Sequence, residues 1–377
     1  MIGAPAPWAV GLLVNPVAGL GGPAGLSGSD GKEIQAEALR RGSLPRSADR
    51  VGRMLRELSR REVSIRLIVP AGPMGEDAAM LAGWVPDVVI PAPTADTTAA
   101  DTTAAAAALV AAGVDVIVFA GGDGTARDVM DGIGAASVVL GIPAGVKMHS
   151  GVFARSPEAA AGILTDAVRG SGRTSVAEVV DIDEDARRRG VLGSRLFGRV
   201  NVLGTSKQMQ GGKIGSQAAP RDVLGGIATE VGRRLDPAAM VLLGPGTTVA
   251  SVARAWDVDS TLLGIDVMHD GQIIASNCSA SELHSLTDGY PLQAVISPIG
   301  GQGFLLGRGN QQLDETLLAR LSGEQLIVVC TPEKLGSLAG GPFWIDTPDP
   351  ELSRSLSGPR RVIIGRRQEA VVHLKNA

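Results

Sequence analysis

The pattern with the clearest chemistry is the run Gly121-Gly122-Asp123-Gly124-Thr125, which follows a strongly apolar segment and precedes a helical pattern. Consecutive glycines let successive backbone N–H groups point at one anion, and the N-terminus of the following helix adds its positive dipole end. Because a carboxylate repels phosphate, Asp123 in this setting suits magnesium binding or acceptance of a proton from an attacking hydroxyl. Thr125 could cap the helix. The alternative is a simple tight strand-to-helix turn in which Asp123 faces solvent.

Glycines also cluster at 19–31, directly after another apolar run. Ligands of parallel sheets sit outside the carboxyl ends of the strands, so the clusters at 19–31 and 121–124 locate one site. Two lysines are candidates for phosphate contact. Lys147 lies in a third glycine-bearing loop beside this site, and Lys207 follows a Gly-Thr-Ser run. A solvated surface position is the alternative for each.

The second half of the chain carries another glycine-bearing turn, Gly244-Pro245-Gly246-Thr247-Thr248, between an apolar run and a helix-like stretch. The amides and hydroxyls of Gly246, Thr247 and Thr248 could bind a further phosphate, in this case on the acceptor. A tight turn imposed by Pro245 explains the same residues.

Two further acceptor-site candidates lie in the same half of the chain. Gly301, in the run Gly300–Gly303, could approach a ligand closely, and a turn of a β-rich lobe explains these glycines almost as well. Asp266 ends a predicted strand and is a candidate second carboxylate.

Other chemistries find no support in the sequence. The histidines (His149, His269, His284 and His373) show no metal-ligand spacing, so surface or hydrogen-bonded roles are expected for them. The absence of GxxxxGK[ST], GxSxG and HExxH argues against P-loop kinases, esterases and zinc proteases. Since no GxGxxG opens a helix after the first strand, an ordinary dinucleotide-dependent dehydrogenase is also disfavoured.

The elements that must position these residues follow from hydrophobic periodicity. Strands and helices alternate from residue 8 to about 142, which is typical of a Rossmann-like parallel sheet with crossover helices. Strands are expected at 8–14, 63–69, 88–90 and 114–120, and helices at 47–60 and 96–112. A helix at 158–169 precedes shorter apolar segments, including 176–182, 241–243, 262–267 and 293–296.

Two domains follow from this α/β pattern and from the length of 377 residues. We expect an α/β nucleotide-phosphate-binding domain at 1–154 and a β-rich acceptor-substrate domain at 155–324. The stretch 325–377 is a candidate to return to the first domain.

Composition bounds the partners and the compartment. The 51 glycines are about twice the usage of about 7% that is typical, while the net charge of −4 gives no attraction to nucleic acid or to anionic membrane. The two cysteines lie far apart without metal spacing, which favours a reducing compartment. The first residues lack a basic segment, so a signal peptide is not expected and the predicted location is cytoplasmic.

The strand that ends in GGDGT resembles the superfamily of NAD kinases and diacylglycerol or sphingosine-type lipid kinases. In that superfamily the motif contributes to the nucleotide-phosphate site, and its Asp, here Asp123, is catalytically essential. The resemblance extends to Asn15-Pro16-Val17-Ala18-Gly19, which looks like the first nucleotide-contacting loop, and to Gly141–Lys147, which occupies the place of the third. It therefore implies nucleotide contacts for Asn15, Gly19 and Gly145.

Longer segments narrow the resemblance. NPVAGLGGPAGLSGSDG, GIPAGVKMHSGVFA, GPGTT and SPIGGQGFLLGRGNQQL look like the ATP-NAD kinase family proteins related to the AcoX proteins of acetoin catabolism, over residues 11–330. The sequence departs from classical NAD kinases, which carry an Asn-Glu pair that holds the NAD ribose, because it contains no Asn-Glu dipeptide. This departure leaves other small hydroxyl compounds open as the acceptor.

The resemblance implies a kinase that transfers the γ-phosphoryl group of Mg²⁺-bound ATP to the 2′-hydroxyl of NAD, with ATP lying across 15–31 and 121–125 between the two lobes. Polyphosphate is an alternative donor, and a homo-oligomer is expected from the resemblance alone. Three rivals stay open: a kinase for another small hydroxyl metabolite, a lipid kinase, and a non-catalytic nucleotide-binding regulator.

Overall fold

The computed structural model describes residues 7–26, 28–29, 31–93, 96–145, 148–182, 194–205, 208–210, 220–321 and 323–377. The chain forms two compact units. Met1–Gly19 with Pro45–Gly212 make up the first, and Leu20–Leu44 with Lys213–Ala377 make up the second.

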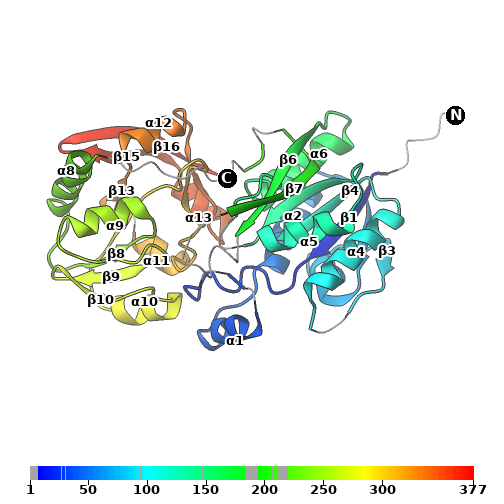
Figure 1. Cartoon of the computed structure of the whole chain (residues 1–377), viewed down its shortest axis with the longest axis horizontal. Helices are drawn as coiled ribbons and strands as arrows, with labels where there is room; N and C mark the ends of the chain where they lie inside the picture. The colour runs from blue at the N-terminus through cyan, green and yellow to red at the C-terminus, as the bar shows by residue number, and fades with distance from the viewer. Residues whose placement is uncertain are drawn as a thin grey trace. The chain divides into compact units, whose positions relative to one another are not determined.

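The first unit is built on a sheet that has seven strands among the described residues, in the order β3-β2-β1-β4-β5-β7-β6 (Figure 1). All neighbouring strands run parallel except β6, which pairs antiparallel with β7. Its elements are β1 (Ala9–Val14), α2 (Ser47–Arg60), β2 (Arg66–Pro70), η1 (Gly72–Met74), α3 (Glu76–Leu81), β3 (Val88–Ile90), α4 (Ala99–Ala111), β4 (Val116–Gly121), α5 (Asp123–Gly132), β5 (Val138–Pro143), α6 (Pro157–Val168), β6 (Thr174–Ile182) and β7 (Ser194–Leu203).

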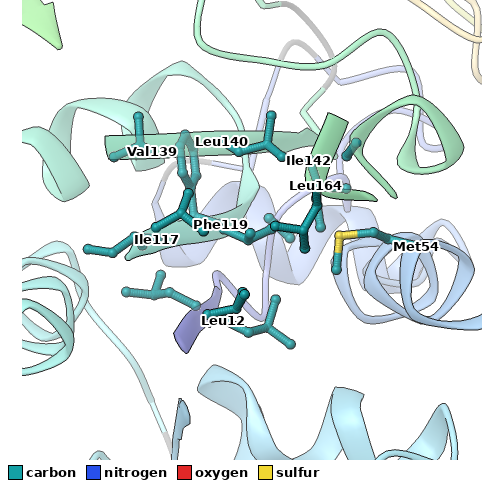
Figure 2. Packing of buried hydrophobic residues seen from close by; sticks show 14 of the residues in the cluster. Leu12, Met54, Ile117, Phe119, Val139, Leu140, Ile142 and Leu164 are labelled. Atoms are coloured by element: carbon teal, nitrogen blue, oxygen red, sulfur yellow. The ribbon is translucent and has the colours of Figure 1, made fainter. Parts of the chain in front are cut away.

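Burial on both faces explains why the central strands are almost wholly apolar. Every residue of β1 and β4 is buried, as expected for parallel strands covered by helices on both sides. Figure 2 shows one hydrophobic cluster that contains Leu12 of β1, Phe119 of β4 and Leu140 of β5. Met54 of α2 and Leu164 of α6 belong to the same cluster. The sequence prediction of a Rossmann-like first domain is thereby confirmed.

The helices of the first unit lie on opposite faces of its sheet. Helix α2 packs against α6, and the guanidinium of Arg53 in α2 binds the carboxylate of Glu158 in α6 through paired hydrogen bonds of 2.9 and 3.0 Å. Helix α4 packs against α5, and a Cβ added at Gly11 of β1 would meet Leu109 of α4. The chain therefore leaves β1 toward α2 on one face and leaves the adjacent strand β4 toward α5 on the other.

The second unit has a mixed sheet, nine-stranded among the described residues, in the order β10-β9-β8-β11-β13-β15-β16-β14-β12. Its centre, β8-β11-β13-β15, is parallel. The elements are α1 (Lys32–Arg40), α8 (Arg221–Gly232), β8 (Met240–Leu243), α9 (Thr247–Arg254), β9 (Asp266–His269), β10 (Gln272–Ala275), α10 (Ala280–Thr287), β11 (Leu292–Ile296), β12 (Phe304–Leu306), α11 (Glu315–Arg320), η2 (Gly323–Gln325), β13 (Leu326–Val329), α12 (Pro332–Ser337), β14 (Phe343–Ile345), α13 (Pro350–Ser355), β15 (Gly358–Gly365) and β16 (Gln368–Asn376).

Alternation along β8 separates two cores of the second unit. Met240 and Leu242 pack in the core that includes Leu283 of α10 and residues of α11. Val241 and Leu243 pack in the other core, with residues of α8 and α9. The two faces of this sheet are therefore covered by different helices, as in the first unit.

The predicted domain boundaries differ from those of the structure. Residues 155–212 stay with the first unit because α6 packs on α2 and β7 pairs with β5. Residues 325–377 belong to the second unit because β13 pairs with β11 and β15 with β13. These pairings join segments far apart in the chain, which local periodicity does not reveal.

The glycine-rich segment after β1 also crosses from one unit to the other. Its residues from Leu20 onward pack in the second unit, where Pro23 O accepts a 2.9 Å hydrogen bond from the Ala280 amide. The segment expected to form the first nucleotide-contacting loop is thus divided after Gly19. None of the helices in the described ranges is long and apolar enough to cross a membrane.

Candidate functional site

The first unit has a topological switch point at the carboxyl ends of β1 and β4, and this position is called the first crevice below. Because the chain leaves these neighbouring strands toward opposite faces, the two following segments separate there, which is the place where open α/β sheets bind ligands. Asn15 follows β1, and Gly121 to Thr125 end β4 and begin α5. The structure thus brings Asn15 and the run Gly121 to Thr125 to one edge of one sheet, whereas the predicted glycine cluster belongs to the second unit from Leu20 onward.

Side-chain contacts hold these segments together. The amide Nδ2 of Asn15 donates a 2.9 Å hydrogen bond to Oγ1 of Thr125, and Oδ1 of Asn15 accepts from the Val17 amide at 3.2 Å. Thr125 is buried and lies so close to Gly121 that a Cβ there would meet the threonine hydroxyl at 2.3 Å. The sequence suggested that Thr125 caps the helix; instead α5 begins at Asp123, and the hydroxyl accepts from Asn15.

Close backbone contacts add the loop after β5. A Cβ at Gly145 would lie 2.9 Å from the Cα of Gly122, and one at Gly19 would lie 2.6 Å from Ala144 O. The amides of Ala144 and Gly145 both donate to Gly121 O. Gly19 and Gly145 are therefore required for packing the three loops, whereas a Cβ at Gly122 would make only an ordinary contact of 3.4 Å with Gly145.

Helix α5 presents an open N-terminus. Its N-cap is Gly122, which supplies no side-chain cap, so the first-turn amides rely on other partners. A Cβ at Gly124 would meet nothing nearer than Asp181 Oδ2 at 3.8 Å. Unlike Gly121, Gly124 is thus not needed for packing, and its lack of a side chain leaves space above the amides where an anion would bind.

Asp123 is buried rather than solvent-facing, with 5% of its surface exposed. Its Oδ2 accepts hydrogen bonds from the His149 amide at 2.6 Å and faces His149 Nδ1 at 3.2 Å. Its Oδ1 accepts from the Ser150 amide at 3.0 Å. The carboxylate is therefore fixed by the turn that follows β5.

That turn is itself fastened to the sheet. The hydroxyl of the fully buried Ser150 donates to Val180 O at 2.8 Å and accepts from the Val180 amide at 3.0 Å. Gln210 donates from Nε2 to Met148 O at 3.0 Å. Asp123 and His149 are thus held by elements on both sides of the turn.

A second switch point of the same kind, called the second crevice below, lies within the second unit between β8 and β11. The chain leaves β8 into α9 on one face and leaves β11 toward α11 on the other. Helix α9 begins after Gly246, which has φ +112° and open space around it and gives no side-chain cap. Gly246, Thr247 and Thr248 therefore occupy the helix N-terminus at a switch point, where backbone amides face a ligand.

Lys334 contributes a charged side chain to the second crevice. Its Nζ donates to Thr248 Oγ1 at 2.8 Å, to Ser297 Oγ at 3.0 Å and to Pro298 O at 3.2 Å. Because Lys334 follows β13, this single ammonium reaches across the end of β11 to the end of β8. It gives the crevice a positive charge next to the amides of α9.

The other acceptor-site candidates differ in how they are placed. Asp266 is 1% exposed and accepts from the amides of Thr261 and Asn277 and from the Thr261 hydroxyl, so it ties two loops together. Gly301 has φ +76° in the turn after β11, a conformation that favours glycine. Lys147 and Lys207 lie outside the described residues.

A buried ion pair supports the loop after β12. Arg308 and Asp346 are 4% and 0% exposed, and Nη2 lies 2.9 Å from Oδ2. Nearby, Asn310 accepts from the Gly307 amide and donates to Leu305 O, each within 2.9 Å. The Gly-Arg-Gly-Asn run thus has a structural role in this loop.

Within the described residues, no three His, Cys, Asp or Glu side chains gather as a metal-binding cluster. Both oxygens of Asp123 already accept hydrogen bonds from amides.

Sequence reasoning missed Lys334 and Ser297 and gave His149 only a hydrogen-bonded or surface role. Lys334 lies four residues after the apolar run that ends at Cys330, so the end of a predicted strand was the available signal. For His149 the signal was its place in the third glycine-bearing loop. Neither residue type is informative without the strand order that joins the loops.

The comparisons with known proteins agree with this two-part organisation. The model of the ATP-NAD kinase N-terminal domain matches residues 10–171, and that of the ATP-NAD kinase C-terminal domain matches 238–374. Neither the search of curated proteins nor that of solved structures gave a match.

Proposed function

Since the chain belongs to the ATP-NAD kinase family, and is thus a phosphotransferase that phosphorylates a small-molecule hydroxyl, we propose that it converts NAD to NADP. In this reaction the γ-phosphoryl group of ATP passes to the 2′-hydroxyl of the adenosine ribose. The observation that carries the proposal is the first crevice, where a buried carboxylate stands at the first residue of a glycine-capped helix.

The first crevice is proposed to bind the donor. Amides of the first turn of α5 would hold phosphate oxygens above Gly124, and the loops of Asn15 and Gly145 would complete the cradle. Mg²⁺ carried by ATP would neutralise phosphate charge during transfer. We propose Asp123 as the carboxylate on which the transfer depends.

The second crevice is proposed to bind the acceptor. NAD carries a pyrophosphate, and the amides of α9, the Thr247 and Thr248 hydroxyls and the Lys334 ammonium are suited to its negative charge. Gly301 would form part of the same crevice. A cytoplasmic enzyme that works on soluble NAD follows from this proposal.

A kinase for another small hydroxyl compound is the second candidate, because the sequence contains no Asn-Glu dipeptide to hold the NAD ribose. The experiment that separates the two is ADP release by purified protein with Mg-ATP and one acceptor at a time: NAD, acetoin-like compounds and polyols. We expect NAD to give the highest kcat/KM, with the kcat of Asp123→Asn toward NAD lowered about 10²–10³-fold.

A preference for a polyol or acetoin-like acceptor would contradict the proposal that NAD is the acceptor, but the protein would still be a kinase. If no acceptor stimulates ADP release although ATP binds, the chain is a nucleotide-binding regulator. Polyphosphate in place of ATP, tested with the preferred acceptor, decides the donor.

A further inference from the structure

We propose that His149 is the general base of phosphoryl transfer and that Asp123 acts on the acceptor through His149. The inference rests on the proposed kinase function and assigns the proton-accepting atom within the same crevice. Its basis is the pair formed by the Asp123 carboxylate and the His149 ring.

The hydrogen bonds of Asp123 leave little of its carboxylate for an acceptor hydroxyl. Each carboxylate oxygen has two lone pairs, and Oδ2 meets two nitrogens of His149, the amide at 2.6 Å and ring Nδ1 at 3.2 Å. Oδ1 accepts from the Ser150 amide at 3.0 Å. With a side chain only 5% exposed, Asp123 is better placed to orient a neighbour than to reach a substrate.

The same geometry fixes the tautomer of His149. An ionised carboxylate only accepts hydrogen bonds, so the Nδ1 that faces it must carry the hydrogen. In the neutral ring Nε2 then holds a free lone pair. Among the residues that the structure describes, none forms a hydrogen bond with Nε2, and 16% of the His149 side chain is exposed.

The position of the pair suits the reaction. Asp123 is the first residue of α5, so His149 lies beside the helix N-terminus proposed to hold the donor phosphates. Histidine is the side chain that most readily exchanges a proton near neutral pH, and a carboxylate behind its ring stabilises the imidazolium that forms.

The proton transfer balances without a further reactant. The acceptor O–H proton passes to Nε2 while the acceptor oxygen forms a bond to the γ-phosphorus. The bond between that phosphorus and the bridging oxygen breaks, and its electron pair leaves with ADP. The imidazolium, held by Asp123, then releases the proton to solvent.

Two variants of His149 distinguish a general base from a residue that only supports Asp123. His149→Gln keeps an N–H donor for Asp123 but cannot exchange a proton, whereas His149→Ala leaves space open to solvent. We expect kcat to fall about 10²–10³-fold in both, with ATP binding retained. Added imidazole should restore at least part of the activity of His149→Ala and none of that of His149→Gln.

His373→Ala is the matched control, because His373 is an exposed histidine of β16 in the second unit, and it should keep wild-type kinetics. If His149→Gln retains activity, His149 only supports Asp123 and the inference is wrong. Failure of imidazole to restore His149→Ala, with the fold and ATP binding intact, would also contradict it.

The ring tautomer can be measured without turnover. Nitrogen NMR of histidine-labelled protein should show His149 with its hydrogen on Nδ1, and Asp123→Asn should lose this preference. A hydrogen on Nε2 in the wild type would overturn the pair. If the wild type phosphorylates no alcohol, the proposed function is wrong, and so is the assignment of His149 as its general base. The nitrogen spectrum still decides in that case whether His149 Nδ1 donates a hydrogen bond to Asp123.

Discussion

The two crevices have the same arrangement of strands and helix, but the side chains in them differ in charge. In each crevice, the chain leaves two neighbouring parallel strands toward opposite faces of the sheet. A helix begins there whose N-cap residue is a glycine, so that no side chain caps the helix. The first crevice contains the Asp123 carboxylate and the His149 ring, whereas the second contains the Lys334 ammonium and hydroxyls.

This difference teaches how one backbone arrangement can serve two tasks. Amides at a helix N-terminus favour an anion in either crevice. A fixed carboxylate and imidazole suit movement of a proton, while an ammonium suits binding of a charge that does not react. We therefore expect the first crevice to govern turnover and the second to govern acceptor affinity.

The largest expected effect comes from two buried carboxylates compared as a matched pair. Asp123 and Asp266 are 5% and 1% exposed, and each accepts hydrogen bonds from two backbone amides. Asp123→Asn should lower kcat about 10²–10³-fold, because the histidine loses its carboxylate. Asp266→Asn should instead cost about 1–3 kcal/mol of unfolding free energy and leave the kcat of the folded protein close to wild type.

Steady-state kinetics and chemical denaturation of both variants measure this contrast. Equal losses of kcat in the two would show that burial, and not position, explains the effect of Asp123.

A smaller effect is expected in the second crevice. Lys334→Met removes the charge that joins Thr248, Ser297 and the Pro298 carbonyl, so KM for the acceptor should rise about ten-fold or more. The KM for ATP should change little. Lys375→Met, an exposed lysine of β16, provides the control for loss of charge alone.

Initial rates measured at varied acceptor concentration with fixed ATP, and at varied ATP with fixed acceptor, give the two KM values. A Lys334→Met protein that keeps its acceptor KM but loses affinity for ATP would reverse the roles assigned to the two crevices.

The smallest expected effect is on ATP binding and tests the proposal that the N-terminus of α5 holds a phosphate. Gly124 and Gly225 are both helical glycines with open space where a Cβ would stand. Alanine at either position should raise stability by about 0.5–1 kcal/mol, because glycine is a poor helix former. Only Gly124→Ala should weaken ATP binding, since its methyl group would occupy the phosphate position.

Calorimetric titration with ATP, together with thermal unfolding, tests this pair. Unchanged ATP affinity in Gly124→Ala would argue against phosphate at this helix end.

Local sequence patterns predicted much of the first sheet and the segments at its edge. The runs that became β1 and β4 are continuous and apolar, and the glycines after them mark the strand ends. The start of α5 was placed too late, because Gly122 gives no side-chain signal of a cap.

Long-range contacts were beyond the reach of the sequence. Lys334 and Thr248 are 86 residues apart, and His149 lies 26 residues from Asp123. Likewise, the assignment of 325–377 to the second unit depends on β13 pairing with β11, which no local period encodes. The site was therefore predictable in its loops and not in its side-chain partners.

The most direct test of the account is phosphorus NMR of the wild-type protein with Mg-ATP and NAD. Loss of the ATP γ-phosphate signal should be matched by equal gains of ADP and of a 2′-phosphomonoester on NAD. Unchanged ATP, or release of inorganic phosphate without a phosphorylated nucleotide, would contradict the proposal that this protein makes NADP.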